Sequence, residues 1–192
     1  MRTAVLDPFR AAMRHHAKGV AVITAGAEHP IGFCATSLAS LSLEPPLVSF
    51  TVGLHSSSWA TIETARHVMV HLLADSQADL AILFGRRFAA KFGPATRWQR
   101  NELGLPVLDG VLAWLELAVT NRTPVGDHAL VIGQVIASWH AAAGRPLIHC
   151  DGEFAALATP LPAGSARPAS PSPVGASSWA RNCPPASTTR NT

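Results

Sequence analysis

Apolar and polar positions alternate in short runs along much of the chain, which is the period of half-buried β-strands. These runs cover residues 20–25, 32–36, 47–52, 67–73, 112–122 and 127–140, with final short ones within 145–157. A turn through residues 26–30 joins the first pair, and Thr-Pro-Val-Gly joins the two longest. Because strands mostly follow one another directly, the pattern predicts an antiparallel barrel rather than a doubly wound sheet.

Helical spacing interrupts the strand pattern in three places. Asp7-Pro8 is a plausible start for a helix over residues 9–18, which Gly19 would end. Serine caps and helical spacing predict a second helix over residues 56–65. Asp75 is expected to cap a third that runs through Phe84.

Composition indicates one well-packed domain followed by a tail. The chain has 192 residues, of which 48% are hydrophobic and 14% charged, so residues 1–159 can bury a real core. Residues 160–192 are rich in Pro, Ser, Ala and Thr and carry almost no sustained apolar pattern. We therefore expect this tail to be disordered.

The position of the charges argues against a nucleic-acid partner. All 12 acidic residues and 12 of the 15 basic residues lie at or before Glu153, so the formal charge of +3 belongs to the tail. A nucleic-acid reader normally carries a basic stripe on its folded domain. The apolar runs are too short for a membrane span, and charged residues interrupt any signal peptide. With three scattered cysteines, we expect a cytoplasmic protein without a membrane partner.

Residues 32–50, GFCATSLASLSLEPPLVSF, place hydroxyl and thiol side chains before two prolines. The segment could be a polar turn, a nucleophile site, or a loop that holds an anionic ligand. A nucleophilic Cys34 would need a base and an electropositive setting, and neither is visible, so a small buried thiol is the simpler interpretation. The chain also lacks the GxSxG, GxGxxG and P-loop motifs of common hydrolases, dinucleotide folds and NTPases.

A second hydroxyl cluster and a basic segment favour a phosphorylated cofactor. Ser56-Ser57-Ser58 with Thr61 opens the second predicted helix, where exposed amides favour an anion. Residues 80–101 hold five basic and no acidic residues, although a solvated basic surface explains such a run equally well. His67 and His71 lie in a strand pattern without a carboxylate partner, so we expect no metal site. His128 follows Gly126-Asp127 and could be a turn residue or project into a site at the mouth of the barrel.

These pieces together resemble the flavin reductase-like family of short-chain NAD(P)H:flavin oxidoreductases. The resemblance runs from about Phe9 to Leu157 and rests on the order and spacing of motifs in this chain: FRAAMRHHAKGVAVITA, GFCATSLASLSLEPPLVSF, GLPVLDGVLAWLEL, GDHALVIGQV and GRPLIHCDGEF. It implies a mainly β, FMN-binding split barrel of antiparallel Greek-key type. It also implies a homodimer that binds FMN or FAD near the dimer interface and uses NADH or NADPH as co-substrate.

The resemblance also implies a set of cofactor-binding residues. It places Ala35, Thr36 and Ser37 along the isoalloxazine ring, and Ser40, Leu41 and Ser42 along the ribityl and phosphate side. Ser57, Ser58 and Thr61 would approach the phosphate, and Phe84 and Arg87 would lie toward the phosphate or adenylate end. His128, the expected catalytic residue, would lie by the flavin and the nicotinamide. Hydride transfer between two cofactors needs close stacking more than a strong acid or base, so the lack of an obvious catalytic dyad is expected.

Two residues depart from the family pattern. Cys34 stands where threonine is expected, and Phe154 where tyrosine is frequent; the chain has no tyrosine at all. These departures bear on the choice of flavin and its affinity. The function implied is a flavin reductase that supplies a partner monooxygenase. The alternatives are a split-barrel flavoprotein that retains its flavin and acts on another substrate, and a non-enzymatic flavin- or haem-binding module.

Overall fold

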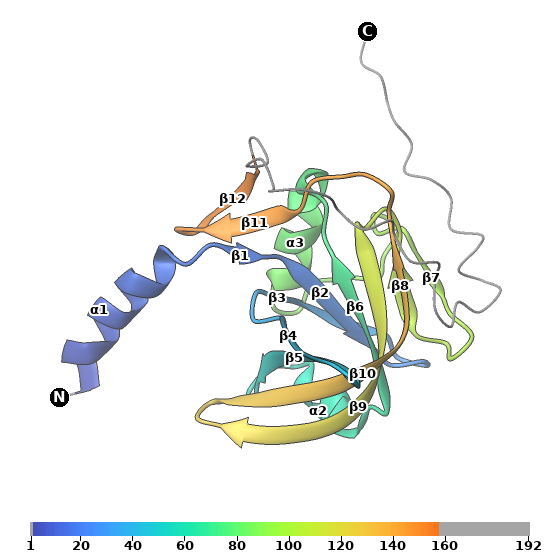
Figure 1. The fold of residues 1–192 in the computed structure, drawn as a ribbon, viewed down its shortest axis with the longest axis horizontal. Coiled ribbons are helices and arrows are strands. Elements are labelled where there is room, and N and C mark those ends of the chain that lie inside the picture. Colours follow the sequence, from blue (N-terminus) through green and yellow to red (C-terminus); the bar gives the residue numbers. More distant parts are fainter. Residues whose placement is uncertain (1, 158–192) are drawn as a thin grey trace, which may run out of the picture.

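The structure, a computed structural model, describes residues 2–157 (Figure 1). The predicted domain boundary at residue 159 and the tail predicted to be disordered lie outside these residues. Within them, no helix is long and apolar enough to cross a membrane.

Strands predominate in the described chain, as the alternating pattern predicts. The strands are β1 (Lys18–Gly19), β2 (Ala21–Ala25), β3 (Ile31–Ala35), β4 (Ala39–Leu43), β5 (Pro46–Gly53), β6 (His67–Leu72), β7 (Trp98–Arg100), β8 (Pro106–Leu108), β9 (Ala113–Val125), β10 (His128–His140), β11 (Leu147–Cys150) and β12 (Glu153–Ala156). The helices are α1 (Arg2–Arg14), α2 (Trp59–Thr64), the 3-10 helix η1 (Asp75–Gln77) and α3 (Ala78–Gly85).

Seven strands form one antiparallel sheet in the order β3-β2-β6-β9-β10-β5-β4. The consecutive strands β3 and β4 therefore lie at opposite edges of the sheet. The strand triplet β1-β11-β12 and the pair β7-β8 form two smaller sheets. The prediction of a mainly β, antiparallel architecture is confirmed.

The core occupies both faces of the central strands. Val22 of β2 packs with Phe84 and Trp114 in one buried cluster, whereas its neighbour Ile23 packs with Phe50 in the other. Successive side chains of a strand point to opposite faces, so β2 separates the two clusters. Because β2 is buried on both faces, β3, which pairs with it, is held against the core.

His71 links two strands from inside the core. Its ring is 0% exposed. Nδ1 lies 3.1 Å from the carbonyl oxygen of Val22, and Nε2 accepts a hydrogen bond from the N–H of Leu108 at 3.1 Å. Because a carbonyl can only accept, Nδ1 carries the proton and the ring is neutral. Burial lowers the pKa of His71 to about 4, and both nitrogens are occupied by backbone groups rather than available to a metal.

The N-terminal helix is displaced from its predicted position. It spans Arg2–Arg14 and contains Pro8 instead of beginning after it. It ends before Lys18 because Lys18 and Gly19 pair with β11, at His149 and Ile148. This long-range pairing leaves no local signal in the sequence.

Three further local predictions were wrong. Asp75 does not cap α3: its carboxylate forms an ion pair with the Nε of Arg145 at 2.8 Å, and α3 begins after Gln77 without a side-chain cap. The hydroxyl-rich segment predicted as a loop contains strand β4, which pairs with β5 at the edge of the sheet. The long hairpin turns at Gly126 and Asp127, since β9 continues to Val125.

The buried histidine predicts a pH-dependent stability. The unfolded chain takes up a proton near pH 6.5 and folded His71 only near pH 4, so the free energy of unfolding is fully retained above pH 6.5 and falls as the pH drops toward 4. The loss amounts to about 3 kcal/mol. We expect His71→Gln to remove this part of the pH dependence, measured by urea unfolding at pH 7 and pH 4. His67→Gln, at the half-buried first position of the same strand, is the control; an equal pH dependence in wild type and His71→Gln would contradict the assignment.

Candidate functional site

A small pocket brings together residues from three distant segments. It has a volume of about 190 Å³, and we call it the Lys91 pocket. It lies between the start of β3, the β5–α2 loop and the segment after α3, and its lining residues are Pro30, Ile31, Gly32, Ser57, Ser58, Phe88, Ala89, Lys91 and Phe92. The sequence-predicted Ser57 and Ser58 therefore meet a cation that was not among the predicted site residues.

One cation, Lys91, lines this pocket, and a second, Arg87, directly precedes the lining residue Phe88 in the chain. The Nζ of Lys91 donates to the carbonyl oxygen of Gly32 at 2.9 Å, and partial burial lowers the pKa of Lys91. The Nη2 of Arg87 donates to the carbonyl oxygen of His55 at 2.9 Å. Ser58 is buried, whereas Ser57 is exposed. Partial burial removes hydrogen-bonding water from the ammonium group of Lys91. A bound anion would replace these lost hydrogen bonds, so the pocket favours an anionic ligand.

Phe84 supports the pocket from behind instead of facing it. Its ring is 1% exposed and meets Phe92 edge to face at a centroid distance of 5.5 Å. A Cβ at Gly32 would lie 2.5 Å from this ring, so only glycine allows β3 to approach α3 this closely. The ring of Phe84 therefore lies behind Gly32 and Phe92 and does not line the pocket.

Ser37 is held by β5. Its Oγ accepts a hydrogen bond from the backbone N–H of Thr51 at 2.9 Å and lies 3.0 Å from the Thr51 hydroxyl. When both groups donate to Ser37, its own proton remains available for a ligand acceptor. Thr51 thus positions an exposed hydroxyl that directly follows β3.

The other hydroxyls of the segment lie progressively farther from the Lys91 pocket. Ser40 pairs with Val48 and Ser42 with Leu47, with Leu41 at an irregularity between them. The β5–α2 loop follows Gly53, six residues beyond Leu47, which is about 20 Å along a strand. Ser40, Leu41 and Ser42 therefore lie beside the first half of β5, away from the loop that contributes Ser57 and Ser58 to the pocket.

His128 stands at the same end of β5 as the pocket. It pairs with Gly53, and its Nε2 is the atom that a Cβ on Gly53 would meet, at 3.8 Å. The Nδ1 of His128 lies 2.7 Å from the carboxylate of Asp127, and this imidazole is 49% exposed. The hydrogen bond lowers the pKa of Asp127. Asp127 also accepts the N–H of Leu54 through its backbone carbonyl, which ties the hairpin to the β5–α2 loop.

The remaining predicted residues divide between the core and other surfaces. The side chain of Ala35 is buried in the barrel core, so only its backbone can face a ligand. Thr36, between Ala35 and Ser37, is half-buried. Thr61 lines a different depression, near Arg66 and His67, and does not join Ser57 and Ser58.

Comparison with known proteins identifies the family. Residues 13–158 match the family described as "Flavin reductase like domain". The chain belongs to this flavin reductase family. The NADH:FMN oxidoreductase of Rhodococcus qingshengii is 40% identical over 152 residues, which are 76% of this chain and 79% of that protein.

Two solved structures extend the comparison to the fold. Nitrilotriacetate monooxygenase component B from Mycobacterium thermoresistibile matches with a TM-score of 0.79 and 32% identity, over 86% of this chain and 95% of that chain. The NADH:FAD oxidoreductase of Streptomyces globisporus, solved with NAD and FAD fragments, matches with a TM-score of 0.76 and 28% identity, over 80% and 93%. The family and the split-barrel fold predicted from the sequence are confirmed.

In this member of the flavin reductase family, the thiol of Cys34 is a poor nucleophile. It is partly covered by the core cluster that contains Val22 and Phe84. Burial raises the pKa of its thiol to about 11, so the thiol remains protonated at neutral pH. These features favour the interpretation of Cys34 as a packed thiol rather than a nucleophile.

Sequence reasoning missed three residues that the geometry brings to this end of the sheet. Lys91 lay within the basic segment, yet the sequence offered no reason to select it over Arg97 or Arg100. Asp127 was noted only as part of the turn before His128. Thr51 gave no signal, because its role depends on the contact with Ser37.

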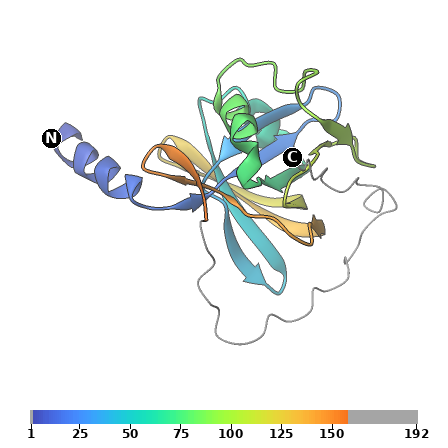
Figure 2. The same ribbon diagram turned by 90° about the horizontal axis from the view of Figure 1, so that it is seen from above.

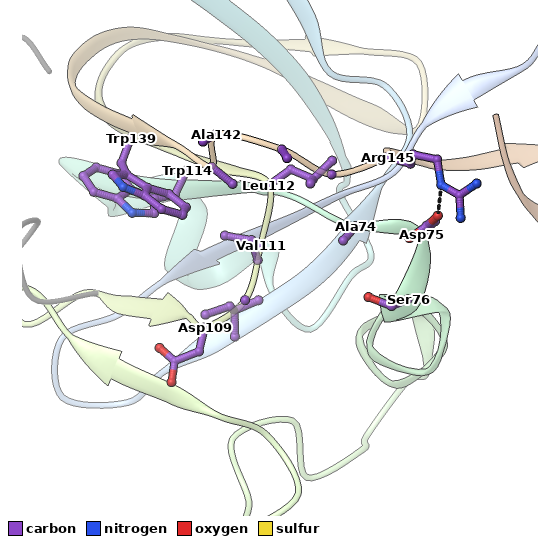
Figure 3. A pocket seen from close by; sticks show the side chains of 15 residues that line it. Ala74, Asp75, Ser76, Asp109, Val111, Leu112, Trp114, Trp139, Ala142 and Arg145 are labelled. Carbon is purple, nitrogen blue, oxygen red and sulfur yellow. Dashed lines mark ion pairs between the residues drawn. The ribbon is translucent and has the colours of Figure 1, made fainter. Parts of the chain in front are cut away.

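A larger cavity lies elsewhere in the molecule, and Figure 3 shows its wall. Its volume is about 390 Å³, and Trp114, Trp139, Leu112 and Val111 are among the lining residues. None of the twelve sequence-predicted site residues lines it. Size alone therefore does not identify the reductase site of this chain.

Proposed function

We propose that this protein is an NAD(P)H-dependent flavin reductase that transfers hydride from NADH or NADPH to FMN or FAD. The observation that carries this proposal is the convergence of Ser37, the Lys91 pocket and His128 around one end of β5, in a chain of the flavin reductase family. The relatives named as an NADH:FMN oxidoreductase and a monooxygenase component support the further proposal that reduced flavin passes to a partner monooxygenase.

The Lys91 pocket fits the phosphate of a flavin nucleotide. Lys91 and Arg87 supply positive charge, while the hydroxyls of Ser57 and Ser58 can donate hydrogen bonds to phosphate oxygens. Lys91 is already held by the carbonyl of Gly32. Its position is therefore set before an anion binds, which reduces the entropy lost on binding.

Ser37 and the backbone after β3 suit the polar edge of the flavin ring. The Ser37 hydroxyl is oriented by Thr51 and keeps a proton to donate. Bound here, the flavin supplies the ring that accepts hydride from the nicotinamide. The chain's part is to orient the two rings, exclude water and place donors near the charge that develops.

We expect His128 to contact the nicotinamide ring, which approaches the flavin from solvent. Asp127 engages Nδ1, so Nε2 is the nitrogen directed toward Gly53 and the site. The imidazole can stack on a nicotinamide or donate to its amide without passing a proton in the hydride step. Asp127 acts through His128 as a positioning residue.

We also propose that the protein is a homodimer. Leu41 and Leu43 on edge strand β4 are 51% and 85% exposed. Helix α1 extends away from the body of the molecule in both views (Figures 1 and 2) and exposes Leu6, Phe9 and Met13 at helical spacing. An exposed edge strand and an exposed apolar helix stripe favour burial against a second copy.

The first prediction concerns turnover. NADH or NADPH oxidation should saturate with added FMN or FAD, and His128→Ala should reduce kcat/KM for the nicotinamide about tenfold while the Kd for flavin changes little. His140→Ala, at the opposite end of β10, is the matched control. Oxidation confined to flavin that remains bound during gel filtration would instead indicate a flavoprotein acting on another substrate. No oxidation with FMN, FAD or riboflavin would exclude the reductase function.

The second prediction concerns the phosphate. Lys91→Ala should weaken FMN binding about tenfold or more, because a charge-assisted hydrogen bond is lost. Riboflavin, which lacks the phosphate, should bind wild type and variant alike, as measured by flavin fluorescence quenching. Arg97→Ala, in the same basic segment, should leave the Kd for FMN unchanged. Equal weakening of FMN and riboflavin by Lys91→Ala would place the phosphate elsewhere.

The third prediction concerns assembly. Sedimentation equilibrium should give twice the chain mass of 20.2 kDa. Replacing both Leu41 and Leu43 by Lys should shift the distribution toward monomer, since charged side chains on an edge strand oppose pairing. Ile82→Lys, at an exposed apolar position on α3, serves as the control. A monomeric wild type at micromolar concentration would refute the dimer.

A further inference from the structure

The tryptophan cavity, as we call the 390 Å³ space described above, is enclosed by four segments (Figure 3). These are η1, the segment before β9, the end of β10, and the link between β10 and β11. The cavity has the size of small-molecule sites, which are commonly 300–1,000 Å³. No residue of the proposed reductase site lines it.

The cavity exists because the β10–β11 link is fixed at both ends and has small side chains between them. The N–H of Ala141 donates to the carbonyl oxygen of Leu112 at 2.7 Å, and the N–H of Asp75 donates to the carbonyl oxygen of Arg145 at 2.9 Å. Residues 141–144 are Ala-Ala-Ala-Gly. At Gly144, φ is +144°, and a Cβ would lie 2.2 Å from the side chain of Leu112. The link therefore covers one side of the cavity, and its small side chains leave the interior empty.

A pair of indoles forms one wall. Trp139 and Trp114 are direct partners across β10 and β9, and Figure 3 shows their rings together at one side of the cavity. Trp114 is buried, whereas Trp139 is half-buried. Indole faces favour flat aromatic rings over flexible chains, because stacking adds to the burial of apolar surface.

The opposite side of the cavity is polar. Figure 3 shows the hydroxyl of Ser76 directed toward the space between the walls. Beside it, Asp75 and Arg145 pair with each other at 2.8 Å, so their charges are mutually compensated. Asp109 also lines the cavity, and its Oδ1 is buried without a hydrogen-bond partner within residues 2–157. The polar side therefore favours a ligand that donates hydrogen bonds and disfavours an anion.

The position of the cavity separates it from the proposed reductase site. His128 begins β10 and Trp139 lies eleven residues later, near the end of the strand. At the rise of an extended strand, eleven residues span up to about 36 Å. The tryptophan cavity shares no lining residue with the Lys91 pocket, and His128 does not line it.

We propose that the tryptophan cavity is a second ligand site, which binds a small, planar aromatic molecule of one or two rings that carries a hydrogen-bond donor and no negative charge. The ring lies against Trp139, and an amino, ring N–H or hydroxyl substituent donates to Ser76. This site is independent of the hydride-transfer function, so it can be tested by binding alone.

The test uses the full chain and indole as the probe, in isothermal titration calorimetry. We expect saturable binding of one indole per chain. Trp139→Ala should weaken it about tenfold through lost stacking and burial, and Ser76→Ala about fivefold through the lost hydrogen bond. Ala142→Leu should abolish binding by filling the space without removing a contact group. Ile136→Ala, at an exposed position on the same strand, should have no effect.

The opposing outcomes are distinct. Absence of saturable heat, or unchanged affinity in Ala142→Leu, would overturn the proposal. Displacement of indole by FMN or NADH would overturn it by making the cavity part of the reductase site. A rise in indole affinity on Trp179→Ala would overturn it by assigning the cavity to the chain's own C-terminal segment. Thermal unfolding of Trp139→Ala and Ala142→Leu checks that both variants are folded.

Discussion

The pairing of β10 with two neighbours organises both proposed sites of this molecule. Residues His128 to Gln134 of β10 pair with β5, while the full strand pairs with β9. The first half therefore places His128 beside the β5–α2 loop. The second half extends past β5, and there Trp139 meets Trp114. One strand thus carries the proposed reductase residue at one end and the tryptophan cavity at the other.

The bend of this strand depends on a close approach between backbones. The register of β10 against β9 shifts near Gly133, where a Cβ would lie 2.9 Å from the Cβ of Leu117. Irregular pairing bends a strand and increases its twist, which a barrel requires. A side chain at Gly133 would force β10 away from β9 and alter the position of both ends.

The titratable groups of this chain fall into two sets: buried groups that pack in the core, and groups with access to solvent that can contact a ligand. His71 and Cys34 are covered by the core, and their pKa values shift so that each stays uncharged at neutral pH. Lys91 is only partly covered and borders a pocket, and the Asp127–His128 pair is exposed. The same residue types therefore differ in role according to their access to solvent rather than according to local sequence.

The amino-acid sequence by itself determined the longer strands, the antiparallel class and the family, because alternation along β5, β6, β9 and β10 and the order of the motifs are local or linear properties. It also identified Ser57, Ser58, Arg87 and His128 as residues of interest. It could not show that β4 is a strand, that Lys18 pairs with His149, or that Phe84 is buried behind Gly32. It gave no reason to choose Lys91, Thr51 or Trp139. These roles arise from contacts between residues far apart in the chain, and only the tertiary structure decides such contacts.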